Sequence, residues 1–180
     1  MKKGLAVKAV ILSLLFLVSI SPLALGADLT PGNTKIYFSP NGGCTEAIIK
    51  EIDQAKTDIF IQAYFFTSSP IAKALLAAHK RGVKVEAILD KSQKTEKYSA
   101  ATFLVNSKIP TFIDSRHAIA HNKIMILDKK TVITGSFNFT KAAEEKNAEN
   151  LQVIKNKEIA SIYLDNWGKH REHSEEYGGR

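Results

Sequence analysis

The sequence predicts an α/β fold in which helices flank both faces of a mixed β-sheet. In the first half of the chain, short runs of branched and aromatic residues alternate with segments whose apolar residues recur at helical spacing, which is typical of layered α/β domains. In the second half, two apolar runs flank Asp128-Lys129-Lys130. They predict an antiparallel hairpin, which makes the sheet mixed. Without internal repeats or linkers in the sequence, we expect one domain.

The first half contains three predicted strands, each followed by a predicted helix. The strands are apolar runs bounded by polar or turn residues, at 35–39, 58–66 and 83–90. The helices have an apolar stripe and cover 45–55, the segment from Pro70 to Gly82, and 95–104. Proline suits the first turn of a helix, and glycine suits its end.

The second half is predicted to contain shorter strands and a final helix. We expect a short edge strand at 109–113, the hairpin strands at 123–127 and 131–134, and a strand at 151–154. Helical spacing of apolar residues from Ile159 to Trp167 defines the last helix, with Trp167 in the core.

The N-terminus has the three parts of a secretory signal peptide. Lysines at positions 2, 3 and 8 precede an apolar run over 9–20, and small residues follow up to Ala27. A membrane span would need roughly 20 apolar residues, more than this run contains. We expect cleavage after Gly26 or Ala27, which removes residues 1–27 and leaves 28–180 as a periplasmic or secreted domain. Because its amphipathic helices read as core-facing, we expect no stable membrane association.

Charge and cysteine content narrow the function only slightly. Loss of the three signal lysines leaves 22 basic against 18 acidic residues, a net charge of +4. This balance is compatible with a polyanionic substrate and does not establish one. Cys44 is the only cysteine, so no intramolecular disulfide can form. We expect a small buried residue there, with an intersubunit disulfide as the alternative.

Polar residues around the predicted hairpin can form a phosphate site. His121 and Lys123 are two residues apart on an extended segment, so their side chains leave the same face, whereas Asp128 has the opposite parity. If Lys129-Lys130 is a two-residue loop, Lys123 lies opposite Ser136 and His121 lies opposite Asn138. A slip of one residue would remove this convergence.

The residues that follow in the second hairpin strand agree with this register. Phe137 and Phe139 would face the core, and Gly135 would let the backbone approach a ligand closely. Lys123, Ser136 and Asn138 can donate hydrogen bonds to phosphate oxygens, and His121 can attack phosphorus or move protons near neutral pH. Without a carboxylate pair or a Cys/His cluster at metal-ligand spacing, the pattern argues for catalysis without a metal or other cofactor. From the spacing alone, the alternative is that His121 and Lys123 are surface residues and that the segment from Gly135 to Asn138 is the end of a strand without a functional role.

The same residues match the HKD signature of the phospholipase D superfamily. The pattern His121-x-Lys123, four residues, Asp128, six residues, Gly135-Ser136-x-Asn138 is present in full. Over essentially the whole mature chain, the sequence resembles the short secreted endonucleases of this superfamily. The resemblance implies a phospholipase D-like fold with one HKD copy per chain.

The resemblance also implies a mechanism and a partner. One HKD histidine forms a phosphohistidine, and a second protonates the leaving oxygen and then activates water. Since the chain has one copy, two subunits would form a symmetric homodimer in which each His121 takes one role. The family carries a glutamate after the motif that orients the histidine ring, and Glu149 fits that position. Asp128 is then a structural residue of the motif.

We therefore expect a metal-independent endonuclease that hydrolyses DNA without sequence specificity, with RNA left open. A phospholipase D-type lipid phosphodiesterase and a catalytically idle nucleic-acid-binding module are the alternatives. Other basic side chains read as solvated or structural. Arg116 and His117 lie in a loop, and His170 and His173 lie in a charged, frayed, solvent-exposed tail.

Overall fold

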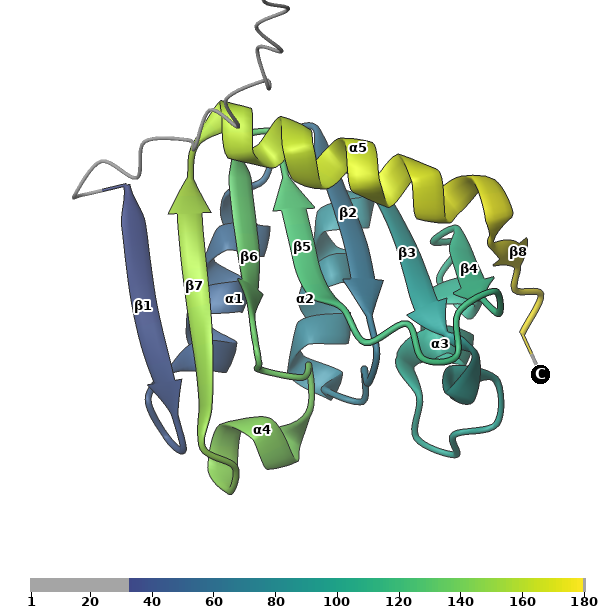
Figure 1. The fold of residues 1–180 in the computed structure, drawn as a ribbon, viewed down its shortest axis with the longest axis horizontal. Coiled ribbons are helices and arrows are strands. Elements are labelled where there is room, and N and C mark those ends of the chain that lie inside the picture. Colours follow the sequence, from purple (N-terminus) through teal and green to yellow (C-terminus); the bar gives the residue numbers. More distant parts are fainter. Residues whose placement is uncertain (1–32, 180) are drawn as a thin grey trace, which may run out of the picture.

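The computed structural model describes residues 33–179, so the predicted signal peptide lies outside the described residues. An eight-stranded sheet has the order β1-β7-β6-β5-β2-β3-β4-β8 (Figure 1). Its strands are β1 Thr34–Ser39, β2 Asp58–Ala63, β3 Lys84–Asp90, β4 Thr111–Asp114, β5 Lys123–Leu127, β6 Thr131–Gly135, β7 Glu149–Lys155 and β8 Glu175–Glu176. The helices are α1 Cys44–Gln54, α2 Ser69–Lys80, α3 Ala100–Asn106, α4 Lys141–Glu145 and α5 Lys157–His173, with a short 3-10 helix at Lys91–Lys94.

The sheet is mixed, as predicted. β2, β3 and β4 are parallel to one another, and each other neighbouring pair is antiparallel. Parallel neighbours require a crossover, which α2 supplies between β2 and β3 and α3 supplies between β3 and β4. Every residue of β2 is buried, because this strand lies in the middle of the sheet and is covered on both faces.

Helices cover both faces, also as predicted. The core on one face contains side chains of α1 to α4, including Ile48, Ile52 and Leu75. The core on the other face is formed against α5, which crosses one end of that face. No other helix of the described residues covers this face, and the segment between β4 and β5 passes over part of the remainder (Figure 1).

Trp167 fixes α5 to the sheet and lies in the core, as its helical spacing predicts. The indole is 6% exposed, and its Nε1 donates a hydrogen bond of 2.9 Å to the carbonyl oxygen of Ile61 in β2. Its ring lies 4.9 Å from that of Phe60. A buried indole with its N–H paired contributes a large apolar area without a desolvation penalty.

Several predicted boundaries shift because side-chain and backbone hydrogen bonds override local propensity. β2 ends at Ala63. Beyond it the chain leaves the strand, and the carbonyl oxygen of Phe65 accepts a hydrogen bond from the Phe139 N–H. α3 begins at Ala100, where the Ser99 hydroxyl caps its first turn. The prediction of a helix start at Thr95 was therefore wrong.

The C-terminal tail is ordered, which corrects the predicted frayed end. α5 continues to His173, and β8 then pairs with β4. β4 is consequently an inner strand, so the prediction of an edge strand there was wrong. Helix α4 also has no counterpart in the prediction. Its Glu144 carboxylate accepts hydrogen bonds from the backbone N–H groups of Gly43 and Thr45 at the start of α1.

The hairpin of β5 and β6 has a different register from the predicted one. Leu127 pairs with Thr131, so the turn contains three residues, and Asp128 and Lys129 have left-handed backbone angles. A two-residue Lys-Lys turn would also require left-handed backbone angles, and it would lack the asparagine or glycine that favours them. Lys123 therefore lies level with Gly135, and the predicted pairs Lys123–Ser136 and His121–Asn138 were wrong.

Candidate active site

The residues of the HKD motif, except Asp128, gather at one end of the sheet. β5 and β7 begin and β6 finishes at this end, because β6 is antiparallel to both neighbours (Figure 1). Lys123 is the first residue of β5, and His121 lies two residues before it. Ser136 and Asn138 follow the end of β6, and Glu149 is the first residue of β7. We call this the HKD end of the sheet. These residues lie at the same end of the sheet because of the strand order and directions. They are not directly opposite one another, as the predicted cross-strand register would require.

Lys123 is a buried cation at this end. It is 7% exposed, its Nζ donates to the His121 carbonyl oxygen at 2.8 Å, and the same atom lies 5.2 Å from the centre of the Tyr64 ring. Burial lowers the pKa of Lys123 below its usual value, and the charge of Glu149 acts in the opposite direction. Glu149 thereby favours the charged form of Lys123, which suits a group that must neutralise a phosphate.

His121 is exposed, and its ring packs against Tyr64. The ring centroids are 4.5 Å apart with planes inclined at 53°. The backbone on either side is fixed, since Ala120 N–H donates to the Asp90 carboxylate at 2.7 Å and Asn122 accepts from Tyr64 N–H at 2.8 Å. The imidazole is therefore open to solvent on a positioned backbone.

Tyr64 and Asp90 are two site residues that sequence reasoning missed. The sequence predicts Tyr64 within a strand that ends at Phe66, and Asp90 as the last residue of a strand. The pairing of Ala63 with Lys123 places Tyr64 beside the motif. The signal available in the sequence was the position of both residues at the C-terminal ends of buried strands, where ligand-binding groups gather in α/β sheets.

Ser136 and Asn138 lie on an irregular exit from β6. The N–H groups of Ser136 and Phe137 both donate to the Asn150 carbonyl oxygen, which marks a bulge. The exposed Ser136 hydroxyl accepts from Asn150 N–H at 3.1 Å, and the buried Oδ1 of Asn138 is without a hydrogen-bond partner in the described part of the chain. As predicted, Phe137 and Phe139 are fully buried.

Gly135 is required here for a reason other than the predicted approach of a ligand. Its φ angle is +150°, and a Cβ atom would collide with the backbone carbonyl oxygen of Asn150. The close approach is therefore between β6 and β7 of the same chain.

Glu149 is half-buried and held by two neighbours. Its N–H donates to the Ser39 hydroxyl at 3.1 Å, and its Oε1 accepts from the Asn147 amide at 3.2 Å. Its negative charge opposes the lowering of the Lys123 pKa, so the carboxylate acts electrostatically on the motif lysine.

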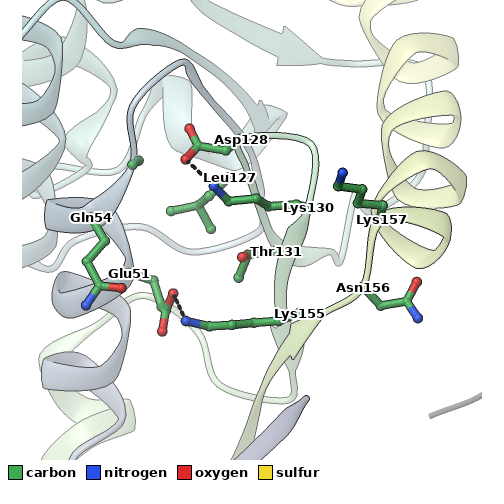
Figure 2. Close-up of a pocket in the computed structure, with 10 residues that line it drawn as sticks. Glu51, Gln54, Leu127, Asp128, Lys130, Thr131, Lys155, Asn156 and Lys157 are labelled. Atoms are coloured by element: carbon green, nitrogen blue, oxygen red, sulfur yellow. Dashed lines mark ion pairs between the residues drawn. The ribbon is translucent and has the colours of Figure 1, made fainter. Parts of the chain in front are cut away.

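Asp128 lies at the opposite end of the sheet, separated from the other motif residues by the length of β5. Its Oδ1 accepts from the N–H groups of Lys56 and Thr57 at 2.9 and 2.8 Å. Burial alone would raise the pKa of Asp128, but these bonds, with those from Lys130 and the Thr57 hydroxyl, lower it to about 2. It borders a cleft of about 400 Å³ together with Lys130 and Lys155 (Figure 2). Its position is that of a structural residue joining the hairpin to the start of β2.

Cys44 is fully buried, as expected. Burial raises the pKa of its thiol to about 11, and Glu144 and Glu46 add to the effect. A thiol with this pKa is a poor nucleophile.

The histidines near the C-terminus are not the exposed tail residues that were predicted. His170 and His173 have side chains 16% and 19% exposed, and both face Asp114 together with His117. Burial would raise the pKa of Asp114, but hydrogen bonds from the His170 and His117 imidazoles, with the nearby imidazole of His173, hold it well below its usual range. Among residues 33–179 this is the one group of side chains close enough to hold a metal ion, and it does not include the HKD residues.

Comparison with known proteins identifies the family. Residues 48–170 match the family described as cardiolipin synthase, PLD-like domain. The chain is 45% identical over 141 residues to a phospholipase D of Rickettsia prowazekii, covering 78% of this chain and 69% of that protein. It also resembles the structure of Nuc from Salmonella typhimurium, with a TM-score of 0.77 and 43% identity over 80% of this chain and 97% of that one. NucT from Helicobacter pylori has a TM-score of 0.72 and 25% identity over 80% and 98%.

The chain therefore belongs to the phospholipase D superfamily. Its eight-stranded mixed sheet with helices on both faces is the fold of that family. Its activity class is that of a phosphodiesterase.

Proposed function

We propose that the protein is an endonuclease that hydrolyses phosphodiester bonds of DNA without sequence preference, with RNA left open as a second substrate. The observation that carries the proposal is the likeness to Nuc over 97% of that chain at 43% identity. Nuc and NucT carry names typical of nucleases, and both are of similar size to this domain. Nothing at the HKD end resembles a base-reading element, and contacts to backbone phosphates carry no sequence information.

The chemistry proposed for the site uses an imidazole nucleophile. Attack of His121 on phosphorus breaks the bond to the leaving oxygen, which takes a proton from a second imidazole. Water, deprotonated by that second imidazole, then displaces His121 and releases the phosphate monoester. Lys123, Ser136 and Asn138 would stabilise the charge on the non-bridging oxygens, and Glu149 would keep Lys123 charged and assist His121.

The second imidazole comes from another subunit in this proposal. The HKD motif occurs once in the chain, so a two-fold symmetric homodimer would supply the partner subunit's His121. Exposed apolar side chains support an interface: Ile36 and Phe38 in β1 are 57% and 66% exposed, and Ile119, two residues before His121, is 57% exposed. Ile36 and Phe38 lie on the face of the sheet that α5 leaves largely uncovered.

We further propose that the domain acts outside the cytoplasm, on the basis of the signal sequence at 1–27. Within residues 33–179, no helix is long and apolar enough to cross a membrane.

Lipid phosphodiester hydrolysis is the second candidate. It is favoured by the match to the cardiolipin synthase family and by the relatives named phospholipase D at 45% identity. The two substrates share the phosphodiester group that the HKD residues would bind, so the site chemistry alone does not separate them.

One experiment separates these functions from an idle binding module. The protein lacking residues 1–27 is incubated with supercoiled plasmid and, separately, with phospholipid vesicles, each with excess EDTA. We expect nicking of the plasmid that persists in EDTA and disappears in His121→Ala. The matched control is His79→Gln, which replaces a histidine in the last turn of α2. Vesicle hydrolysis without nicking would favour the lipid function, and binding without either reaction would favour the idle module. Activity lost in EDTA at a temperature where the fold is intact would refute the metal-free mechanism.

A further inference from the structure

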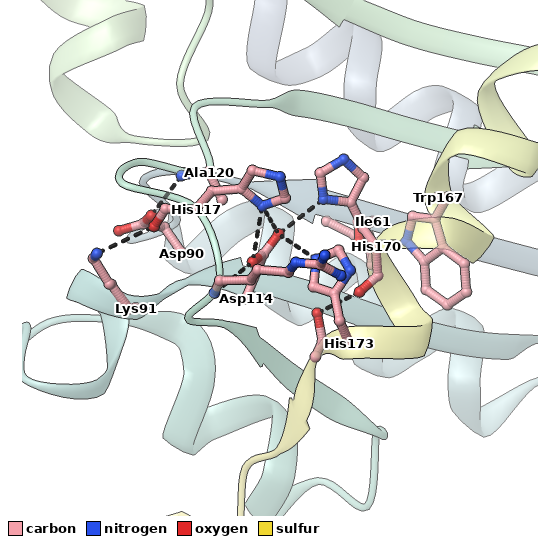
Figure 3. Close-up of polar contacts among 11 residues, drawn as sticks. Ile61, Asp90, Lys91, Asp114, His117, Ala120, Trp167, His170 and His173 are labelled. Atoms are coloured by element: carbon pink, nitrogen blue, oxygen red, sulfur yellow. Dashed lines mark hydrogen bonds and ion pairs between the residues drawn. The ribbon is translucent and has the colours of Figure 1, made fainter.

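Three histidines surround one buried carboxylate, away from the HKD residues. Asp114 ends β4, His117 lies in the loop that leads to β5, and His170 and His173 lie in the last turns of α5 (Figure 3). The side chain of Asp114 is fully buried. Two chain segments more than 50 residues apart thus converge on one oxygen atom, Oδ2 of Asp114.

The distances within this cluster suit a tetrahedral ion. Oδ2 of Asp114 lies 2.9 Å from His117 Nδ1, 2.8 Å from His170 Nδ1 and 3.4 Å from His173 Nε2. All four ligand atoms lie within 4.8 Å of one another. A tetrahedral zinc ion with bonds of about 2.0–2.1 Å separates its ligands by roughly 3.3 Å, so small side-chain rotations would complete the coordination.

Hydrogen bonding alone leaves the cluster incompletely satisfied. The Nε2 atom of His173 is buried, faces the carboxylate, and lacks a hydrogen-bond partner within the described residues. Leaving a buried polar atom unpaired costs about 1–3 kcal/mol. A cation at the centre would use this nitrogen and the lone pairs of the other two imidazoles.

We propose that Asp114, His117, His170 and His173 bind one divalent transition-metal ion, with Zn²⁺ as the best match. Three imidazole nitrogens and one carboxylate oxygen are ligands that zinc prefers, and calcium and magnesium prefer oxygen ligands instead. Four protein ligands leave no open position, so the site is structural.

The surroundings of the four ligands fit this assignment. Oδ1 of Asp114 accepts the Arg116 N–H at 3.1 Å, which orients the carboxylate so that Oδ2 faces His170 and His173, while His117 Nδ1 lies within 3.1 Å of both oxygens. The Ser174 hydroxyl donates to the His170 carbonyl oxygen at 2.7 Å and so steadies the end of α5. A cleft of about 650 Å³, bordered by His117, His170 and His173, gives an ion a route from solvent.

The ion would connect the end of α5 to the loop that leads to His121. Its binding free energy would add to the free energy of unfolding, because the four ligands come together only in the folded chain. This role does not depend on the reaction at the HKD end. Hydrolysis would therefore continue in EDTA at temperatures below the melting temperature of the metal-free protein.

The test uses the mature chain purified without a polyhistidine tag. Zinc content is measured after dialysis against buffer with a weak competing chelator, and the melting temperature is measured with added Zn²⁺ or Mg²⁺ after EDTA treatment. The variants are His170→Gln with His173→Gln as a double substitution, and His79→Gln as a control that removes a histidine elsewhere. Cobalt substitution of the unmutated protein gives a visible spectrum that reports tetrahedral nitrogen and oxygen ligation.

We expect one zinc ion per chain in the unmutated protein and in His79→Gln, and a higher melting temperature with Zn²⁺ and not with Mg²⁺. In the double variant, zinc affinity should fall by more than about 100-fold, since two of four ligands are lost. Zinc bound equally well by the double variant would overturn the proposal. So would an unmutated protein that binds no zinc or gives an octahedral cobalt spectrum, a result that does not depend on whether the variant folds.

Discussion

The imidazole of His121 packs against the phenol ring of Tyr64, with the ring centroids 4.5 Å apart. The same phenol ring lies 5.2 Å from Lys123 Nζ. Tyr64 therefore contacts the two residues that define the start of the HKD motif, although it lies 57 positions before His121 in the sequence. Its ring limits the orientations that both side chains can adopt.

Replacing Tyr64 should therefore impair the reaction more than the fold. Tyr64→Ala removes the surface on which His121 rests, and we expect kcat to fall roughly 10- to 100-fold through misplacement of the imidazole. Tyr64→Phe keeps the ring and should retain most of the activity. The kinetics of plasmid nicking check this, and equal losses in both variants would assign the effect to the hydroxyl instead.

Asp90 should act as a positioning residue for the loop before His121. Its carboxylate accepts from Ala120 N–H at 2.7 Å and from Ser92 N–H at 2.9 Å. Asp90→Asn replaces one acceptor oxygen by a donor, so we expect faster amide exchange at residues 117–121 and a drop in kcat of about tenfold with KM less affected. Asp165→Asn, an exposed change in α5, is the control. Unchanged amide exchange together with lost activity would show a direct catalytic role.

Asp128 should matter for stability and not for chemistry. It accepts hydrogen bonds from Lys56 and Thr57 N–H at the far end of β5. Asp128→Ala leaves these donors unpaired, and we expect the free energy of unfolding to fall by about 1–3 kcal/mol. Activity per folded molecule should remain near that of the unmutated protein. Denaturant unfolding and nicking assays test this against Asp53→Asn, an exposed change in α1. Lost activity in a stable variant would contradict it.

The same carboxylate predicts a pH dependence of stability. The pKa of Asp128 is lowered from 3.8 to about 2, so its stabilising contribution is complete above about pH 4 and is lost as pH falls through about 2. The contribution near neutral pH is about 2 kcal/mol. The difference in unfolding free energy between the unmutated protein and Asp128→Asn should therefore shrink from pH 4 to pH 2. A constant difference over that range would show that Asp128 does not titrate as described.

Local patterns predicted most of the sheet because its strands are buried on both faces and carry a strong apolar signal. β2 and β3 were found for this reason. The predicted hairpin register was wrong by one residue because the turn has three residues and not two. Asp128 and Lys129 adopt left-handed backbone angles in this turn, and neither residue type indicates such angles from the sequence. β8 has two residues and exposed side chains, so no apolar pattern marks it.

Side-chain clusters were predictable only where a contiguous motif carries them. His121, Lys123, Ser136 and Asn138 lie within 18 positions and could be read together. The cluster at Asp114 joins two segments far apart in sequence, and its signal was the three-residue spacing within each pair, Asp114 with His117 and His170 with His173. Spacing of three residues places His170 and His173 on the same side of a helix, and this applies only because α5 extends to His173.

In the proposed homodimer, two subunits share one active site through their His121 residues. The most direct test is a heterodimer of one unmutated and one His121→Ala subunit, carrying different affinity tags and purified through both in turn. A shared site predicts that nicking by this heterodimer falls to nearly the level of the His121→Ala homodimer, since either the nucleophile or the proton donor is missing. Retention of half the activity of the unmutated protein would show two independent sites and contradict the claim.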